Sequence, residues 1–465
     1  MSNQILPYDS TSVSEIISFA KKLENSTLRK SCHGIQFEKK GNKGSFGNIL
    51  EELYFKLKRN SRSEPDFYRT GLELKTGGLK KLKNGEFRAK ERLVMNIINF
   101  SKIHKEDFKS SSFYKKNSHL LLVFHIFDKN LQDIDKLIKV VGEWSYSNND
   151  LKIIESDWKK IQKKIKDGKA HTLSEGDTLY LGASTKGSKS AKSMANQPFS
   201  KIKAHRRAFS LKYKYINHVI ACISGHKNDI YGSIINDPNI IDSNNSFEDI
   251  VIKKFVPYLG KNIDDIKEYL GMDLNKKNNK GYHAGITKRI LGIELGKRIE
   301  EFEKAGIIVK TVRLKSNDMP DQHVSFPTFK FKEIINESWE GSDWKRILES
   351  KFFFIFLRIS NEGNKFEKVK FWNMSQTDID EAKKILTKTI EVLNSGRIVR
   401  KVEKNGTKKN FFPKPSENKI GHVRPHGHIT TYELPTPDRL TGLKDYMKQS
   451  FWFNARYVRD EIFSE

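Results

Sequence analysis

The interpretation of this chain rests on one stretch near its N-terminus, Ser63-Glu64-Pro65-Asp66-Phe67-Tyr68-Arg69-Thr70-Gly71-Leu72-Glu73-Leu74-Lys75-Thr76. From Leu72 to Lys75 apolar and charged residues alternate, which predicts a β-strand with Glu73 and Lys75 on the same face. Asp66 precedes this strand, and Gly71 allows the chain to turn between them. Two carboxylates beside an ammonium suit Mg²⁺, which prefers oxygen ligands, and a phosphate held by that cation. The stretch thus predicts a site for metal-dependent cleavage of a phosphodiester.

The pattern carries little weight alone, because acidic-x-lysine triplets are common in a lysine-rich chain. Glu38-Lys39-Lys40 and Glu381-Ala382-Lys383 have the same pattern and are typical of solvated surface charge. The prediction therefore depends on the composition and on the surrounding segments.

The composition indicates a folded protein with a polyanionic partner. The 465 residues suffice for two or three domains, and 37% hydrophobic residues are typical of a globular chain. The formal net charge of +28 points most simply to nucleic acid. Cys32 and Cys222 lie too far apart for a metal-ligand motif, and two cysteines do not make a disulfide scaffold. Residues 1–10 show no signal-peptide pattern and no apolar run could span a bilayer, so we expect a cytoplasmic protein without membrane contact.

Three further segments have the composition of nucleic-acid contacts. The basic loop that contains Lys43 and Gly44 precedes a predicted helix over 48–57, which carries Glu51 and Glu52; a plain helix cap explains the loop equally well. Small residues and lysines mix over 181–192, which suits either a flexible linker or a loop that enters a DNA groove. A predicted strand over 208–215 places Ser210, Lys212 and Lys214 on one face.

The second half of the chain repeats the first in the same order. Glu301–Thr311 aligns with Asp66–Thr76, and the apolar run Phe352–Phe356 aligns with Leu120–Phe124, a predicted buried central strand. Ser450–Asn454 aligns with Ala208–Lys212, and the segment Gly421–His426 aligns with the proposed groove loop. The repeat predicts two α/β domains, each a mixed sheet flanked by helices, over 1–227 and 246–465, with a linker at 228–245.

The two halves differ at the acidic positions. Ile308 stands where the first half has Glu73, and the helix segment Ile286–Leu291 has no carboxylate in place of Glu51. An isoleucine cannot hold a metal ion, so we expect the second half to be catalytically inactive. Its loop stays basic, and Arg424 can contact a guanine edge with two hydrogen bonds.

These residues resemble the MutH family, which comprises a mismatch-repair nicking endonuclease and related two-domain type II restriction endonucleases that cut at GATC. The resemblance covers nearly the whole chain, and it implies two tandem MutH-like domains of the restriction-endonuclease type. It implies a catalytic set of Glu51, Asp66, Glu73 and Lys75, in which the three carboxylates surround Mg²⁺ and the lysine orients the attacking water. It also implies that the following residues contact DNA: Lys43, Gly44, Ser184, Thr185, Lys186, Arg424, Pro425 and His426. The basic face of the predicted strand over 208–215 adds Lys212 to these contacts. The family has Arg-Pro-Lys in the groove loop; the second half reads Arg424-Pro425-His426, whereas the first departs from it with Ser184-Thr185-Lys186.

The resemblance implies a restriction endonuclease that cuts both strands of duplex DNA at GATC, is paired with a cognate DNA methyltransferase, and meets DNA as a single chain or a dimer. The second domain would bind a second site and activate the first. Two alternatives stay open: a nicking repair endonuclease recruited by a partner, and a basic DNA- or RNA-binding protein without catalysis. A third reads His422, His426 and His428 as a transition-metal site, although no cysteine or acidic ligand lies near them.

Overall fold

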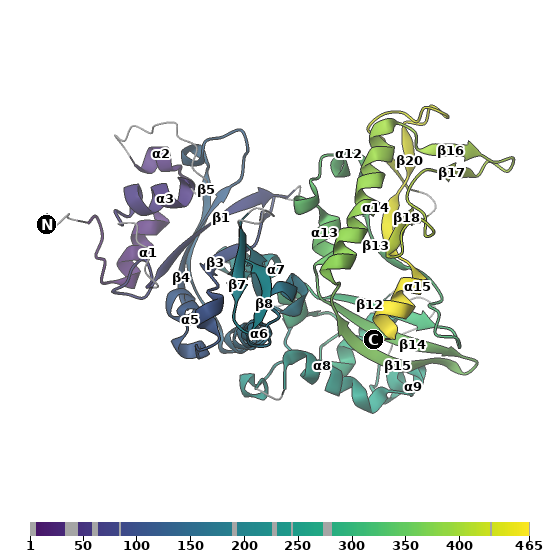
Figure 1. The fold of residues 1–465 in the computed structure, drawn as a ribbon, viewed down its shortest axis with the longest axis horizontal. Coiled ribbons are helices and arrows are strands. Elements are labelled where there is room, and N and C mark those ends of the chain that lie inside the picture. Colours follow the sequence, from purple (N-terminus) through teal and green to yellow (C-terminus); the bar gives the residue numbers. More distant parts are fainter. Residues whose placement is uncertain are drawn as a thin grey trace. The chain divides into compact units, whose positions relative to one another are not determined.

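The computed structural model describes residues 6–32, 45–57, 64–82, 85–187, 193–225, 230–242, 245–272, 281–427 and 430–464. The chain forms two compact units (Figure 1). The first unit comprises residues 1–247 with 296–306, and the second comprises 248–295 with 307–465. The predicted linker at 228–245 falls within the first unit, where β10 (Tyr231–Gly232) pairs with β11 (Arg298–Ile299).

The first unit contains a four-stranded mixed sheet and a three-stranded antiparallel sheet. The larger sheet has the order β2 (Phe87–Ala89), β1 (Glu73–Lys81), β4 (His119–Ile126) and β5 (Ile138–Ser145). The smaller sheet has the order β3 (Leu93–Ile97), β9 (Arg207–Leu211) and β6 (Leu181–Thr185). A hairpin of β7 (Met194–Gln197) and β8 (Ser200–His205) lies between β6 and β9 in the chain. β4 is an inner strand with buried residues at 120–125, as the apolar run predicted.

Helices surround these sheets. Those of the first unit include α1 (Val13–Lys21), α2 (Leu28–Ser31), α3 (Ser45–Ile49), a π-helix (Leu50–Tyr54), α4 (Phe100–Ile103), α5 (Ser112–Asn117), α6 (Asn148–Lys166), α7 (Tyr213–Ile223) and α11 (Glu300–Ala305). One hydrophobic core joins α1 and the π-helix to Leu74, Leu121 and Val123 of the sheet. Side chains alternate along a strand, so Glu73 and Lys75 point to the opposite face.

The second unit repeats this architecture. One three-stranded sheet has the order β12 (Ile308–Leu314), β14 (Phe352–Ser360) and β15 (Gly363–Trp372). The other three-stranded sheet has the order β13 (Val324–Phe329), β21 (Gln449–Phe453) and β18 (Gly421–Pro425). Further strand pairs are β16 (Val399–Val402) with β17 (Lys408–Asn410) and β19 (Thr431–Glu433) with β20 (Asp445–Met447). Its helices include α8 (Phe247–Phe255), which starts at the boundary, α9 (Ile263–Tyr269), α10 (Tyr282–Ile290), α12 (Phe331–Ile334), α13 (Asp343–Leu348), α14 (Gln376–Ser395), α15 (Ala455–Tyr457) and a π-helix (Val458–Phe463).

The repeat extends to the register of the strands. Glu73 lies opposite Leu120 in the parallel pair β1–β4, and Ile308 lies opposite Phe352 in the parallel pair β12–β14. In the smaller sheets, Thr185 at the end of β6 corresponds to Pro425 at the end of β18. Each half is therefore a mixed α/β unit, as the sequence predicted, and β12, β14 and β15 repeat the order of β1, β4 and β5.

One local prediction was confirmed with different bounds, and another was wrong in its second half. The helix predicted over 48–57 is α3 followed by a π-helix that ends at Tyr54. The strand predicted over 208–215 ends at Leu211, and α7 starts at Tyr213 with Lys212 as its N-cap residue. Alternation over a few residues does not distinguish a strand from the first turn of a helix.

Candidate active site

A tight turn brings the two predicted carboxylates together. The N–H of Phe67 donates to the carbonyl oxygen of Leu72 at 3.0 Å, which closes the turn in front of β1. Gly71 has a φ of +73°, a conformation that glycine adopts without the steric cost of a Cβ. Asp66 consequently lies beside the start of the strand that carries Glu73.

Asp66 and Glu73 hold each other in place through backbone hydrogen bonds. The N–H of Asp66 donates to Glu73 Oε2 at 3.0 Å, and the N–H of Leu74 donates to Asp66 Oδ2 at 3.1 Å. Each carboxylate is thus fixed by the main chain next to the other. This fixed geometry reduces the reorganisation that binding requires.

Two ammonium groups face the buried carboxylate of Glu73. Lys75 Nζ lies 2.5 Å and Lys116 Nζ 3.5 Å from Glu73 Oε1. Glu73 is only 1% exposed, and this burial raises its pKa to about 7. The Lys75 ammonium opposes that rise, the Asp66 carboxylate adds to it, and Lys116 opposes it more weakly. Near neutral pH the site therefore has a proton to exchange.

Sequence reasoning missed Lys116. It lies on α5, which ends just before β4, and β4 pairs with β1 in parallel. No local motif marks this lysine, because only the pairing of two distant strands brings it to Glu73. A single sequence contains no signal that could have found it.

The donor atoms fit a hard divalent cation. Asp66 and Glu73 present carboxylate oxygens on one side of the sheet, the ligand type that Mg²⁺ takes. Among the residues that the structure describes, no group of three or more His, Cys, Asp or Glu side chains forms a metal site. Glu51 is therefore not part of such a group in this structure, and its role as the third carboxylate stays a prediction.

Glu51 lies on the π-helix that continues α3. This helical segment starts close to β1, because a Cβ on Gly47 would lie 3.3 Å from Thr76 Oγ1. Glu51 is partly exposed and Glu52 is exposed. Lys43 and Gly44, predicted DNA contacts, lie outside the described residues.

The groove loop, defined here as Ser184–Lys186, lies at the end of β6. Thr185 and Lys186 are exposed, whereas Ser184 is buried and donates through Oγ to the carbonyl oxygen of Ala208 at 3.2 Å. The N–H of Lys186 donates to the carbonyl oxygen of Arg206 at 2.8 Å. The side chains of Thr185 and Lys186 are thus presented to solvent, whereas the hydroxyl of Ser184 forms a hydrogen bond within the β6–β9 sheet.

Lys212 is engaged within the first unit. Its Nζ donates to the carbonyl oxygens of Glu175 and Thr178, each at 2.5 Å. These two bonds tie two of the three N–H groups of the ammonium to the main chain. The side chain therefore stabilises the start of α7 in the free protein.

The second unit brings Arg424, Pro425 and His426 together at the end of β18. The Arg424 guanidinium lies 5.0 Å from the ring centroid of Trp452, and the His426 ring lies 5.7 Å from the same ring. A pocket of about 470 Å³ opens here, lined by Arg424, Pro425, His426, Gly427, Met447 and Trp452. His422 is buried and its Nδ1–H donates to Asn454 Oδ1, 2.7 Å away, and His428 lies outside the described residues.

The positions that correspond to the catalytic residues no longer form an acidic cluster, because Ile308 stands at the position of Glu73. Lys310, at the position of Lys75, donates to the carbonyl oxygen of Ser325 at 2.5 Å, and burial lowers its pKa to about 8. Glu301, at the position of Asp66, is buried in the first unit and accepts the N–H groups of Ile234 and Ile235. Glu301 therefore has a structural role.

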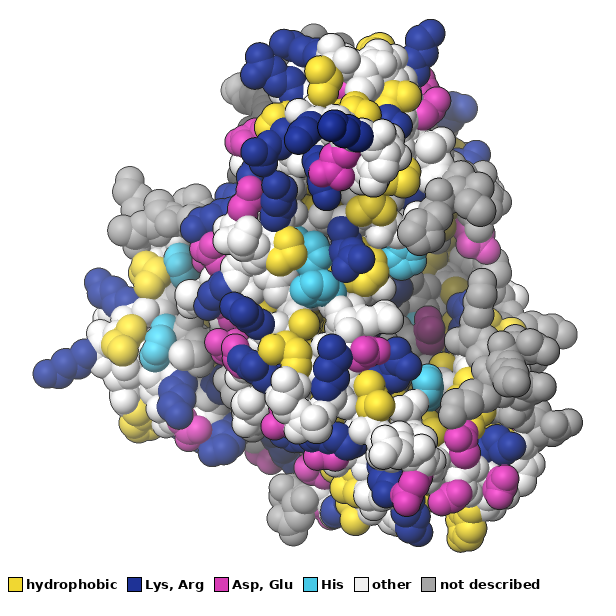
Figure 2. Space-filling view, turned by 90° about the vertical axis from the view of Figure 1, so that its right-hand side faces the viewer, with side chains coloured by type: hydrophobic (Ala, Val, Ile, Leu, Met, Phe, Trp, Pro, Cys, Tyr) yellow, Lys and Arg dark blue, Asp and Glu magenta, His cyan; other side chains and the backbone are white. Residues whose placement is uncertain are grey.

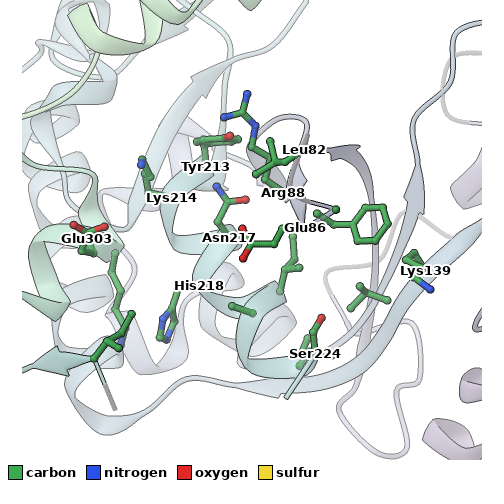
Figure 3. Close-up of a pocket in the computed structure, with 18 of the residues that line it drawn as sticks. Leu82, Glu86, Arg88, Lys139, Tyr213, Lys214, Asn217, His218, Ser224 and Glu303 are labelled. Atoms are coloured by element: carbon green, nitrogen blue, oxygen red, sulfur yellow. The ribbon is translucent and has the colours of Figure 1, made fainter. Parts of the chain in front are cut away.

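A pocket of about 1170 Å³ in the first unit does not contain the acidic cluster. Asn217 and His218 of α7 line it together with Glu86 and Arg88 (Figure 3). Burial lowers the pKa of His218 to about 4, with the nearby Lys304 acting in the same direction. Asp66, Glu73 and Lys75 lie outside this lining, as expected for a duplex substrate that needs an open surface.

Surface charge agrees with a nucleic-acid substrate. Lys and Arg side chains are spread over the face shown in Figure 2, and the chain as a whole carries a formal charge of +28. In the part of the chain that the structure describes, no helix is long and apolar enough to cross a membrane.

The cluster of two carboxylates and a lysine on a strand of a mixed sheet defines the class: a nuclease of the MutH type. A family model described as "DNA mismatch repair enzyme MutH" matches residues 55–157, which include Asp66, Glu73, Lys75 and Lys116. The chain is 37% identical over 464 residues to the type II restriction enzyme Sau3AI of Staphylococcus aureus, which covers 91% of this chain and 93% of the relative. The chain belongs to the MutH family, in the branch of its type II restriction enzymes. It is a site-specific deoxyribonuclease, which sets aside the non-catalytic binding protein.

Proposed function

We propose that this restriction enzyme requires Mg²⁺ and hydrolyses both strands of duplex DNA at GATC, with the second unit binding a further GATC site as an activator. The observation that carries the proposal is the asymmetry at one register position. Glu73 and Ile308 lie opposite Leu120 and Phe352 in otherwise equivalent strand pairs. One unit thus keeps the acidic cluster and the other keeps only a basic loop.

In the proposed mechanism Asp66 and Glu73 would hold the cation, and Glu51 would complete the acidic shell. When bound, Mg²⁺ supplies Lewis-acid stabilisation of the charge that develops on the phosphate. Lys75, now bonded to Glu73 Oε1, orients the attacking water and balances negative charge in the transition state. Loss of the Glu73 proton must precede cation binding, since a metal ligand has to be deprotonated.

DNA recognition is assigned to the two loops. Lys186 is exposed at the end of the first groove loop and contacts DNA at the cut site. In the second unit, Arg424 stacks beside Trp452, which orders its guanidinium for a bidentate contact with guanine. The GATC sequence follows from the resemblance to the MutH family.

The cellular setting is proposed on the same basis. A restriction enzyme acts in the cytoplasm beside a cognate DNA methyltransferase that protects the host's own sites. A dimer on DNA is one arrangement that places two catalytic units on the two strands.

Digestion of plasmids with known GATC sites tests the proposal. We expect linear product in Mg²⁺, none in EDTA, and fragment ends that map to GATC. Plasmids methylated at adenine or at cytosine in the site reveal which mark protects. Cutting that persists in EDTA, or ends that map to another sequence, would contradict the assignment.

A further inference from the structure

The β7–β8 hairpin continues the strands that carry the groove loop. β8 leads through Arg206 into β9, so residues 200–211 run almost without interruption. β6 pairs with the β9 part, and β7 pairs with the β8 part. The N–H of Lys186 donates to Arg206 O, and the N–H of Arg206 donates to Ser193 O. The hairpin therefore extends beyond the groove loop on the same ribbon.

The tip of this hairpin is held rigidly. Gln197 is 7% exposed; its Oε1 accepts the N–H of Ala170 at 2.8 Å, and its Nε2 donates to the carbonyl oxygen of Ile202 at 2.6 Å. A Cβ on Gly168 would lie 2.6 Å from the carbonyl oxygen of Phe199, so the tip packs on backbone that only glycine permits. The hairpin is thus fixed to the body of the first unit.

Phe199 at the tip is strained and exposed. It has a φ of +62°, which a bulky side chain rarely adopts, and it is 69% exposed. Such strain persists only where surrounding structure imposes it, and it is concentrated at functional positions. Pro198 and Phe199 form the two-residue turn between β7 and β8, and the packing of this turn on Gly168 holds the conformation in place.

One face of the hairpin is basic. Ala204 is fully buried, and side chains alternate along a strand, so Lys201 and Lys203 share the opposite, outward face. Both lysines are exposed, as are Lys186 and Arg206 at the base of the hairpin. Alternate residues of a strand are separated by about 6.8 Å, which is close to the spacing of successive phosphates along one DNA strand. The outward face therefore matches a sugar-phosphate backbone in charge and in spacing.

We propose that the β7–β8 hairpin is a second DNA-contacting element of the catalytic unit, in which Lys201 and Lys203 bind phosphates of the duplex that flanks the recognised sequence. The inference rests on the proposed function of the groove loop. It adds a contact that fixes the duplex in position without reading bases.

The salt dependence of DNA binding tests this contact. We expect a Lys201→Ala/Lys203→Ala variant to reduce the slope of log affinity against log salt by about 1.8, at about 0.9 for each phosphate. The loss should be the same for GATC and for random duplexes. The matched control is Lys30→Ala/Lys129→Ala, which removes the same charge from two exposed lysines outside the hairpin. The control should leave the slope within about 0.3 of the wild-type value.

A second measurement separates a local contact from a general loss of charge. Wild-type protein should bind a duplex with long flanks more tightly than one that ends at the site, whereas the alanine variant should bind both equally. Lys201→Arg/Lys203→Arg should restore the slope and the preference, because arginine also binds phosphate. An unchanged slope in the alanine variant, or an equal change in the control, would overturn the proposal. A hairpin that binds a protein partner instead of DNA predicts the unchanged slope. Failure of the GATC assignment appears separately, as absent cutting or absent preference for GATC, because the slope can be measured on any duplex.

Discussion

Replacement of Glu73 by glutamine tests the electrostatics of the acidic cluster. Burial raises the pKa of Glu73 from its ordinary 4.5 to about 7. The folded protein therefore holds a proton that the unfolded chain releases between these values, so stability falls as the pH rises through this window. At about 1.4 kcal/mol per pH unit, the free energy of unfolding falls by about 3 kcal/mol in total, and about 2.5 kcal/mol of this loss occurs between pH 5 and pH 8. Glu73→Gln removes the titrating group and should remove this part of the pH dependence.

The assay is denaturant unfolding of both proteins in metal-free buffer at pH 5 and pH 8. The quantity compared is the change in free energy of unfolding between the two pH values, because other titrating groups then cancel. Added Mg²⁺ should stabilise wild type more at pH 8 than at pH 5, since the cation binds the deprotonated carboxylate. Glu73→Gln should show little response to Mg²⁺. Equal pH dependence in the two proteins would refute the reasoning that Glu73 is buried and protonated near neutrality.

Three further predictions concern catalysis, activation and the turn. Asp66→Ala should abolish cleavage and keep or strengthen DNA binding, and Lys75→Ala should slow cleavage about a thousandfold, which corresponds to a barrier higher by about 4 kcal/mol. Cleavage and gel-shift assays on the same preparations test both expectations. Robust cutting by Asp66→Ala would contradict the metal site. A plasmid with two GATC sites should be cut faster than one with a single site, and a short GATC duplex added in trans should speed the single-site reaction. Arg424→Ala should remove that stimulation, whereas a second unit that only clamps DNA would make the added duplex an inhibitor. Gly71→Ala should lower the free energy of unfolding by about 1 kcal/mol through backbone strain alone, because nothing lies within 4 Å of the added Cβ. Gly71→Asn should lower it less, because asparagine tolerates this conformation better. An equal loss of stability in the two variants would argue against strain.

The features that follow from neighbouring residues were predictable. Alternation from Leu72 to Lys75 gave the strand, and Gly71 gave the turn that places Asp66 at its start. The order of matching segments predicted two similar α/β units, and the paired registers of Glu73 and Ile308 agree with that alignment. Where propensities compete over a few residues, the prediction was wrong, as in the strand that becomes α7 after Lys212.

Sequence by itself determined the kind of chemistry and the repeat, because periodicity, turn residues and charge act over short distances along the chain. Only the tertiary structure decided which side chains meet. Lys116 reaches Glu73 because β4 pairs with β1, and the Arg424 guanidinium lies against Trp452 because β18 pairs with β21. The same packing turns the Lys212 ammonium to the carbonyls of Glu175 and Thr178. These contacts join residues far apart in the chain, and they depend on strand register and burial, which no local pattern encodes.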